Sequence, residues 1–274
     1  MVNYSIVNIY NMIDQKITII GGGNLGGAVA FGLIKSKQIQ SSDLTVSDRY
    51  TSILKKFQEQ GATTTDNNIE AVRNADIIIL AIKPYQANEI LAEIKPVLNS
   101  NQILISAVAG LGLPKLEEAL SGSGIQIFRI MPNTAIAIQE SMTLISTNVK
   151  SEEVCNLVVH IFDQLGKALI ITEDLMAAAT VLGSCGIAFA LRYMRAAMQG
   201  GIEMGFSAEM AQFITAQTVK GAAQLILESG RHPEQEIDKV TTPRGITITG
   251  LNEMEHQGFS SSLIQGLIAS FNKC

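Results

Sequence analysis

A glycine-rich segment near the start of the chain constrains the fold more than any other feature. The apolar run Ile17–Ile20 leads into Gly21-Gly22-Gly23-Asn24-Leu25-Gly26, and small residues that favour a helix follow. Gly21, Gly23 and Gly26 match G-x-G-x-x-G, in which the glycines serve a tight turn, close approach of a pyrophosphate and helix–strand packing. An ordinary glycine-rich turn has the same pattern, so its context must decide. The segment predicts strand, turn and helix, with phosphates held at the helix start.

A second short strand supplies that context. Leu44–Ser47 ends at Asp48-Arg49, about 20 residues beyond the last glycine, where a dinucleotide fold contacts the adenosine ribose. Asp48 accepting hydrogen bonds from a ribose diol favours NAD, whereas Arg49 pairing with a 2′-phosphate favours NADP. A solvated strand end also explains the pair. The choice between NADP and NAD therefore stays open.

Composition excludes several functional classes. The 274 residues are 47% hydrophobic, which is enough for a sizeable core, and the net charge is -5. Without a Lys/Arg-rich block, we expect no binding to nucleic acid or to a membrane. Cys155, Cys185 and Cys274 form no C-x-x-C pair, and the three histidines are scattered, so we expect no metal site and a reducing cytoplasm.

The N-terminal residues do not have the pattern of a signal peptide. They lack a cationic start and an uninterrupted apolar core, so residues 1–15 are expected to be a poorly ordered leader, with Met12 as an alternative start. Leu175–Leu191 is nearly free of charge and just long enough to span a membrane. Because Gly183, Ser184 and Gly186 interrupt it, we interpret it as a buried or dimer-forming helix.

The middle of the chain alternates strands and helices. A polar helix over 52–60 and a short helix after Asn68 precede the apolar strand 75–82, which stops at Lys83-Pro84. Lys83 then either faces the cofactor or merely leaves the strand end. Helices at 87–98 and 114–120 and strands at 102–106 and 125–130 continue the pattern, which predicts an α/β, doubly wound Rossmann-type sheet.

The regular alternation of strands and helices changes after Asn133. Strands at 142–146 and 168–171 flank a helix at 152–165 and complete the sheet, whereas nearly everything from Glu173 onward favours a helix. We therefore expect a boundary near 166–173, with a dinucleotide-binding domain over 16–170 and an all-α dimerisation and substrate domain over 171–274.

Several separate motifs together resemble the Δ1-pyrroline-5-carboxylate reductase family. With the glycine-rich turn they are Ala81–Pro84, Arg129–Thr134, Gly221–Ala223, Glu228–Pro233 and Asp238–Leu251, which occur in the family's order and spacing over residues 16 to 272. The resemblance implies a Rossmann domain followed by a helical domain that pairs with its twin. It also implies hydride transfer from NADPH or NADH to the imine carbon of a cyclic imine carboxylate, which makes L-proline in a homodimer or an assembly of dimers.

The resemblance also implies roles for individual residues. Thr180 falls near the nicotinamide, as a hydrogen-bond donor or proton relay to the ring nitrogen of the imine, although a core threonine bonded to its own helix is the alternative. Thr242, Gly245, Ile246 and Thr247 fall at the substrate. The cofactor-binding residues are Gly21, Gly23, Asn24, Leu25, Gly26, Asp48, Arg49, Asn68, Ala81, Ile82, Lys83, Pro84, Ala107, Val108, Ala109 and Asn133.

The loop from Thr242 to Thr247 has a physical case of its own. It precedes a helix of about ten residues, so backbone N–H groups and threonine hydroxyls converge at a positive helix end that suits a carboxylate. A plain helix cap formed by Thr247 is the alternative.

Departures from the family pattern leave alternatives open. Gly183–Phe189 replaces Ser-Gly-Ser-Gly-Pro-Ala-Tyr, and Arg244 and Ser141 replace glycines. Arg244 either strains a loop that needs φ > 0 or adds a grip on the substrate carboxylate, which favours a larger or dicarboxylic imine. The alternatives to pyrroline-5-carboxylate reductase are a related imine or ketimine reductase and a nucleotide-binding regulator without turnover.

Overall fold

The computed structural model describes residues 12–274 and divides into two compact units between Ser184 and Cys185. Residues 1–11 of the expected leader lie outside the described residues. At its end, Ile13 is buried and its N–H donates to the Gln38 carbonyl at 2.6 Å. The packed chain therefore includes Ile13, which the sequence assigned to the leader.

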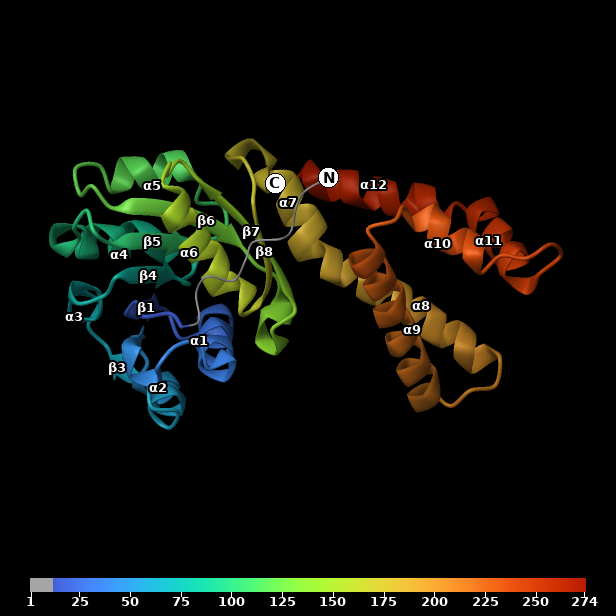
Figure 1. The fold of residues 1–274 in the computed structure, drawn as a ribbon, viewed down its shortest axis with the longest axis horizontal. Helices are drawn as coiled ribbons and strands as arrows, with labels where there is room; N and C mark the ends of the chain where they lie inside the picture. The colour runs from blue at the N-terminus through green and yellow to red at the C-terminus, as the bar shows by residue number, and fades with distance from the viewer. Residues whose placement is uncertain (1–11) are drawn as a thin grey trace. The chain divides into compact units, whose positions relative to one another are not determined.

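The first unit is built on one eight-stranded sheet (Figure 1). The order of the strands across the sheet is β3-β2-β1-β4-β5-β6-β7-β8. The first six strands in this order run parallel to one another, β7 runs antiparallel to β6, and β8 runs parallel to β7. The doubly wound sheet is confirmed. The strands are β1 (Ile17–Ile20), β2 (Leu44–Ser47), β3 (Thr63–Thr65), β4 (Ile77–Leu80), β5 (Ile103–Ser106), β6 (Gln126–Met131), β7 (Ser141–Thr147) and β8 (Gly166–Ile170).

Strand β3 is absent from the sequence-based prediction. Its three threonines form a partly exposed edge strand with no apolar alternation, and pairing with β2 brings them into the sheet. The other strands begin and end within a few residues of their predicted bounds.

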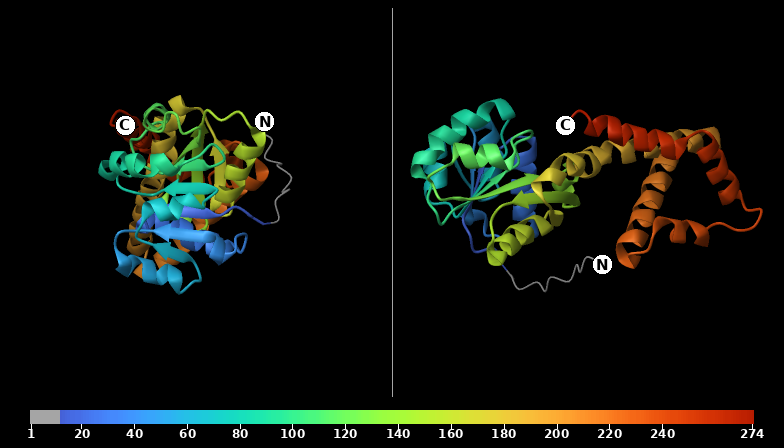
Figure 2. Two further views of the ribbon diagram at one scale, coloured as in Figure 1. Left: turned by 90° about the vertical axis from the view of Figure 1, so that its left-hand side faces the viewer. Right: turned by 90° about the horizontal axis from the view of Figure 1, so that it is seen from above.

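Helices cover both faces of this sheet (Figure 2). Side chains of α1, α2 and α6 pack with Ile77 and Ile79 on one face, and those of α3, α4 and α5 pack with Ile78 and Leu80 on the other. All four side chains of β4 are fully buried, as expected of a central parallel strand. The helices are α1 (Asn24–Ser36), α2 (Thr51–Gln58), α3 (Asn68–Arg73), α4 (Ala87–Ile94), α5 (Leu113–Ala119) and α6 (Glu152–Asp163).

A continuous helical run, Glu173–Glu203, follows the sheet. It contains α7 (Met176–Ala179), the π-helix Thr180–Cys185 and α8 (Gly186–Glu203). By length and composition alone this run is long and apolar enough to cross a membrane. The last strand ends at Ile170, close to the expected boundary, but the run up to Ser184 belongs to the first compact unit because Met176 and Val181 are buried.

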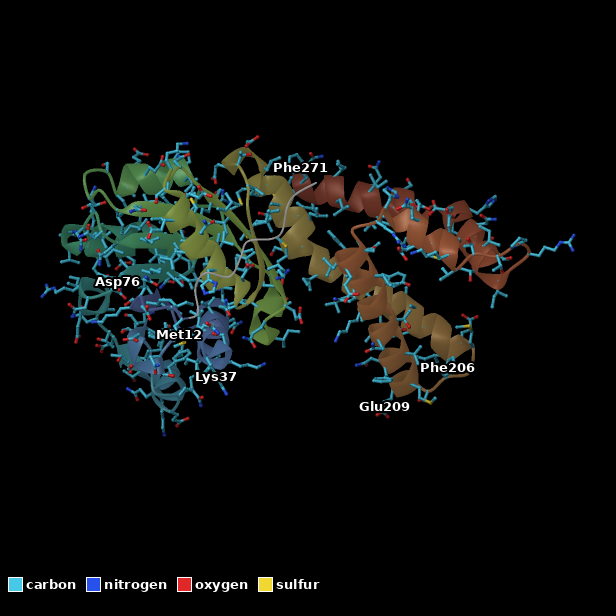
Figure 3. The ribbon with its side chains drawn as sticks, viewed as in Figure 1. Met12, Lys37, Asp76, Phe206, Glu209 and Phe271 are labelled. Atoms are coloured by element: carbon cyan, nitrogen blue, oxygen red, sulfur yellow. The ribbon has the colours of Figure 1, made fainter. Side chains whose placement is uncertain are left out.

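The second unit is entirely helical. Besides α8 it contains α9 (Ala208–Ser229), α10 (Pro233–Lys239), α11 (Ile246–His256) and α12 (Phe259–Phe271). Helices α8 and α9 form a hairpin in which Gly201 packs on Ala211, and Phe206 and Glu209 flank its turn (Figure 3). Within residues 185–274, all of which are described, Gly201 and Ala211 are the only buried residues.

Candidate active site

A cavity of about 710 Å³ opens where β1, β2, β4 and β5 end. These strands are parallel, so their carboxyl ends meet at one edge, where open α/β sheets bind ligands. The structure thus brings together most of the predicted cofactor residues. Those lining the cavity are Gly21, Gly23, Asn24, Leu25, Asp48, Arg49, Asn68, Ala81, Ile82, Lys83, Pro84, Ala107 and Ala109.

The three glycines of the turn have different surroundings. A Cβ at Gly21, where φ is +100°, would lie 2.5 Å from the Ala81 oxygen, and one at Gly26 would overlap the Gly21 carbonyl. At Gly23 a Cβ would meet nothing within 4 Å. The turn therefore packs tightly against β4 and α1, while at Gly23 its backbone is open to the cavity.

The Asp48 carboxylate is held by the backbone. Its Oδ2 accepts from the Gly22 N–H at 2.8 Å, and its Oδ1 accepts from the Tyr50 N–H at 2.9 Å. The Arg49 guanidinium lies over the Tyr50 ring, with Cζ 4.9 Å from the ring centroid. Asp48 thus joins the two loops at the strand ends, and Arg49 and Tyr50 form a flat cationic part of the cavity wall.

Asn68 connects two other parts of the cavity wall. Its Oδ1 accepts from the Ser47 hydroxyl at 2.8 Å, and its Nδ2 donates to Glu93 at 2.9 Å. Sequence reasoning missed the other lining residues, which lie at the ends of β1 and β2, at the start of α2, and between Pro84 and the end of α4. Proximity to Asp48 or Lys83 in the sequence is a weak signal for several of them. The missed residues are Ile20, Ser47, Tyr50, Ile53, Tyr85, Gln86, Glu89, Ile90 and Glu93.

Three residues predicted to bind cofactor do not line the cavity: Gly26, Val108 and Asn133. Gly26 and Val108 are buried in the packing around it. The Asn133 side chain accepts from the Ala135 N–H at 3.0 Å and donates to the Gly183 carbonyl at 3.0 Å. Asn133 therefore connects the end of β6 with the π-helix.

Thr180 lies at the start of that π-helix. Its hydroxyl donates to the Met176 carbonyl at 2.7 Å. This is the bond to its own helix backbone that the sequence analysis gave as the alternative to a catalytic role. Glu173, where the helical run begins, accepts from Arg129 at 2.5 Å, from the Leu113 N–H at 3.1 Å and from the Ser146 hydroxyl. Glu173 thus bonds the start of the run to the sheet, whereas the Thr180 bond stays within the run.

The loop before α11 lies in the second unit. Gly245 is the N-cap of α11 and forms a turn with the Thr242 carbonyl, and Thr247 lies inside the helix. Because no side chain caps this end, the first-turn N–H groups face outward. Arg244 has φ 60°, Thr242 and Thr247 are exposed, and Ile246 is 93% exposed.

The charges around this loop are partly paired. Glu236 bonds Lys239 at 2.6 Å and Arg231 at 3.5 Å, and these cations lower the pKa of the Glu236 carboxyl. Arg244 takes part in none of the ion pairs found among residues 12–274. Arg244 is therefore available to bind an anion at the start of α11.

Cys155 and His160 lie on α6, and neither lines the cavity. Burial, with Glu152 nearby, raises the pKa of the Cys155 thiol, and burial lowers the pKa of His160. Among residues 12–274 no three His, Cys, Asp or Glu side chains are grouped so that they could hold a metal ion.

Comparisons with known proteins match both units. A family model described as "NADP oxidoreductase coenzyme F420-dependent" matches residues 16–110, and one described as "Pyrroline-5-carboxylate reductase dimerisation" matches residues 173–274. A solved structure of Plasmodium falciparum pyrroline carboxylate reductase with NADP bound has a TM-score of 0.82 and 29% identity, covering 96% of this chain and 97% of that one.

Curated relatives give the same result. Pyrroline-5-carboxylate reductase 1 of Dictyostelium discoideum is 42% identical over 96% of this chain, which spans half of that relative's length. Pyrroline-5-carboxylate reductase 2 of the same organism is 37% identical over 95% of this chain and 92% of the relative. The chain therefore belongs to the pyrroline-5-carboxylate reductase family.

Proposed function

We propose that this protein is a pyrroline-5-carboxylate reductase that transfers a hydride from NAD(P)H to the imine carbon of its substrate and so forms L-proline. The observation that carries the proposal is the cavity at the carboxyl edge, lined by a glycine turn in a chain of this family. The cofactor supplies the hydride when it is bound. The protein's task is to bind, orient and shield the reactants.

The turn and the start of α1 suit a pyrophosphate. Gly23 leaves open space beside the backbone, and the 13-residue helix α1 begins at Asn24 without a side-chain cap. Its free N–H groups and positive end favour phosphate oxygens. We assign Gly21, Gly23, Asn24 and Leu25 to the phosphates, and Ala81 to Pro84, Ala107 and Ala109 to the remaining wall of the cofactor site.

The finer choice of cofactor follows from the ribose end. Both Asp48 oxygens already accept backbone hydrogen bonds, whereas the Arg49 guanidinium is stacked on Tyr50 in the cavity wall. A stacked guanidinium suits the 2′-phosphate because it offers a preorganised fork of donors. We infer that NADPH is preferred over NADH.

Arg49→Gln is expected to lower kcat/KM about tenfold for NADPH and little for NADH. An unchanged ratio of kcat/KM for NADPH to kcat/KM for NADH would contradict this preference.

The substrate carboxylate binds, in this proposal, at the start of α11. The N-cap is a glycine, so the first-turn N–H groups and the Thr242 and Thr247 hydroxyls are available to an anion. Arg244 supplies a cation directly before the cap. Gly245 is needed because a Cβ there would lie 2.5 Å from the Thr242 hydroxyl oxygen.

Thr180 is the proposed hydrogen-bond donor or proton relay to the imine nitrogen. Its hydroxyl proton is directed at Met176, so the hydroxyl must rotate to donate to substrate. Such rotation is accessible because a side-chain bond to the helix backbone contributes little.

The homodimer is supported by the dimerisation model and by the apolar surface of the second unit. Phe213 and Leu227 on α9 are 73% and 76% exposed, and a second copy would cover such side chains. A second copy would also cover the apolar run Glu173–Glu203.

The cytoplasm is the proposed compartment, because the free cysteines stay reduced there.

One assay tests the function. Oxidation of NADPH and NADH is followed by absorbance with and without racemic pyrroline-5-carboxylate, and proline is identified in the product. Substrate-dependent turnover is expected. Turnover with another cyclic imine alone, especially a dicarboxylic one, would transfer the assignment to a related imine reductase, and cofactor binding without turnover on any imine would favour a regulator.

A further inference from the structure

The helical run becomes π-helical where it passes the carboxyl edge of the sheet. Six residues, Thr180–Cys185, have this conformation. π-Helical turns are rare and concentrate at functional sites, because the wider turn leaves backbone groups without their usual helical partners. One carbonyl in this segment, that of Gly183, accepts from the Asn133 side chain at 3.0 Å.

Asn133 is itself held in place from several directions. It is 7% exposed and lies two residues beyond Met131, the last residue of β6. Its Oδ1 accepts from the Ala135 N–H, and its own N–H donates to the Ser141 hydroxyl at 3.1 Å. Ser141 in turn lies 3.2 Å, oxygen to oxygen, from the buried Thr143 hydroxyl.

These bonds define the orientation of the amide. The oxygen faces an N–H donor and the nitrogen faces a carbonyl acceptor, so a flipped amide would lose both bonds. Capping Ala135 requires only an oxygen, which Asp or Ser would also supply. The bond to Gly183 requires a donor, and this is the contact for which an asparagine is needed.

The hydrogen bond between Asn133 and Gly183 connects the end of β6 with the π-helix that carries Thr180. Because β6 runs parallel to β5, Asn133 lies at the same carboxyl edge as the cofactor cavity, although it does not line it. Gly183 lies three residues beyond Thr180 in the same π-helix. Moving this carbonyl would therefore move the backbone that carries the Thr180 hydroxyl.

We propose that Asn133 is a positioning residue, which holds the π-helix through the Gly183 carbonyl and so places Thr180 for the reduction. The inference rests on the proposed function. Asn133 contacts neither cofactor nor substrate, and its effect on turnover passes through Thr180. The buried Ser141 and Thr143 hydroxyls support it from the β7 side.

Asn133→Asp isolates this contact. The aspartate keeps the oxygen that caps Ala135 but places an oxygen against the Gly183 carbonyl. Asn133→Ser also keeps a capping oxygen, and it removes the amide group that reaches Gly183 without introducing repulsion. We expect kcat to fall about tenfold or more, because small displacements of catalytic groups are costly. The dissociation constant for NADPH, measured by its fluorescence without imine, should stay unchanged.

Asn148→Asp is the matched control. It makes the same substitution at an exposed amide that donates to Glu117 at 2.7 Å, outside both proposed sites, so its kcat should equal that of the wild type. If Asn133→Asp weakens NADPH binding instead of lowering kcat, Asn133 contacts cofactor. If both Asn133 variants fail to fold, its role is structural. Either result overturns the proposal.

Two further measurements separate this inference from the proposed function. In a Thr180→Val background, Asn133→Asp should lower kcat little further, and an equal loss in both backgrounds would show that Asn133 does not act through Thr180. Amide hydrogen exchange needs no turnover: it should rise in residues 180–185 of Asn133→Asp and stay unchanged in Asn148→Asp. Unchanged exchange in both would refute the contact even if the natural substrate were a different imine.

Discussion

At the scale of single residues, Arg244 shows how one departure from a family pattern affects both stability and binding. The sequence predicted strain there if the position required φ > 0, and the observed φ is 60°. A non-glycine residue in this region costs on the order of 1 kcal/mol. Its exposed side chain, just before the uncapped start of α11, is in a position to offset that cost by binding an anion.

Arg244→Gly tests both effects. The free energy of unfolding, from urea titration at constant protein concentration, should rise by about 1 kcal/mol because glycine adopts this conformation without strain. The KM for the imine should rise because a cation is lost at the carboxylate. Higher stability with an unchanged KM would show that Arg244 does not contact substrate.

His160 predicts how stability depends on pH. Burial lowers its pKa and nearby Asp163 raises it, with burial the larger effect. The unfolded chain therefore binds a proton at about pH 6.5 that the folded protein still excludes, so stability is lost as pH falls below that value. Between about pH 7.5 and pH 5.5, the free energy of unfolding should fall less in His160→Gln than in the wild type, by at most roughly 1.4 kcal/mol per pH unit. An equal loss in both proteins would assign it to other groups.

At the scale of elements, the strand–turn–helix at Gly21 to Gly26 is defined by local sequence and completed by contacts with β4. The spacing of its glycines predicted the element correctly. It did not predict that the Asp48 carboxylate would bind the Gly22 N–H, because that bond joins loops 26 residues apart. The same reason hid β3 and the π-helix: three threonines and a widened turn have no distinctive pattern until neighbouring segments pack on them.

Gly26→Ala tests the packing of this element. The added Cβ would overlap the Gly21 carbonyl and lie 3.0 Å from the Ala81 Cβ, so α1 must move away from the turn. We expect a loss of roughly 1–3 kcal/mol in stability and weaker binding of NADPH. Gly23→Ala is the informative comparison, because it meets no protein atom: it should impair cofactor binding without a comparable loss of stability.

At the scale of the whole molecule, the two units differ in how they are stabilised. The sheet unit buries apolar side chains on both faces, whereas residues 185–274 bury only Gly201 and Ala211. A helical unit with so little interior cannot offset its conformational entropy alone. Its stability must come from further contacts, and the family model for dimerisation matches residues 173–274, which include this unit.

Phe213→Asp should therefore disrupt assembly. A charge at a 73% exposed phenylalanine of α9 would be buried in a subunit contact, and light scattering should show a shift from dimer to monomer with loss of activity. Lys220→Asp, on the same helix, changes charge at a polar position and serves as the control. A Phe213→Asp protein that keeps the mass and activity of the wild type would place the subunit contact elsewhere.

The sequence by itself determined what depends on local pattern: the glycine turn, the alternation of strands and helices, the helix after Gly245, and the family. The tertiary structure decided what depends on contacts between distant segments. It gave Asp48 two backbone partners, directed the Asn133 amide to Gly183 rather than to the cavity, and left the apolar side chains of α9 exposed. The physical reason is that hydrogen-bond partners and burial belong to pairs of segments, and periodicity reports only on one segment at a time.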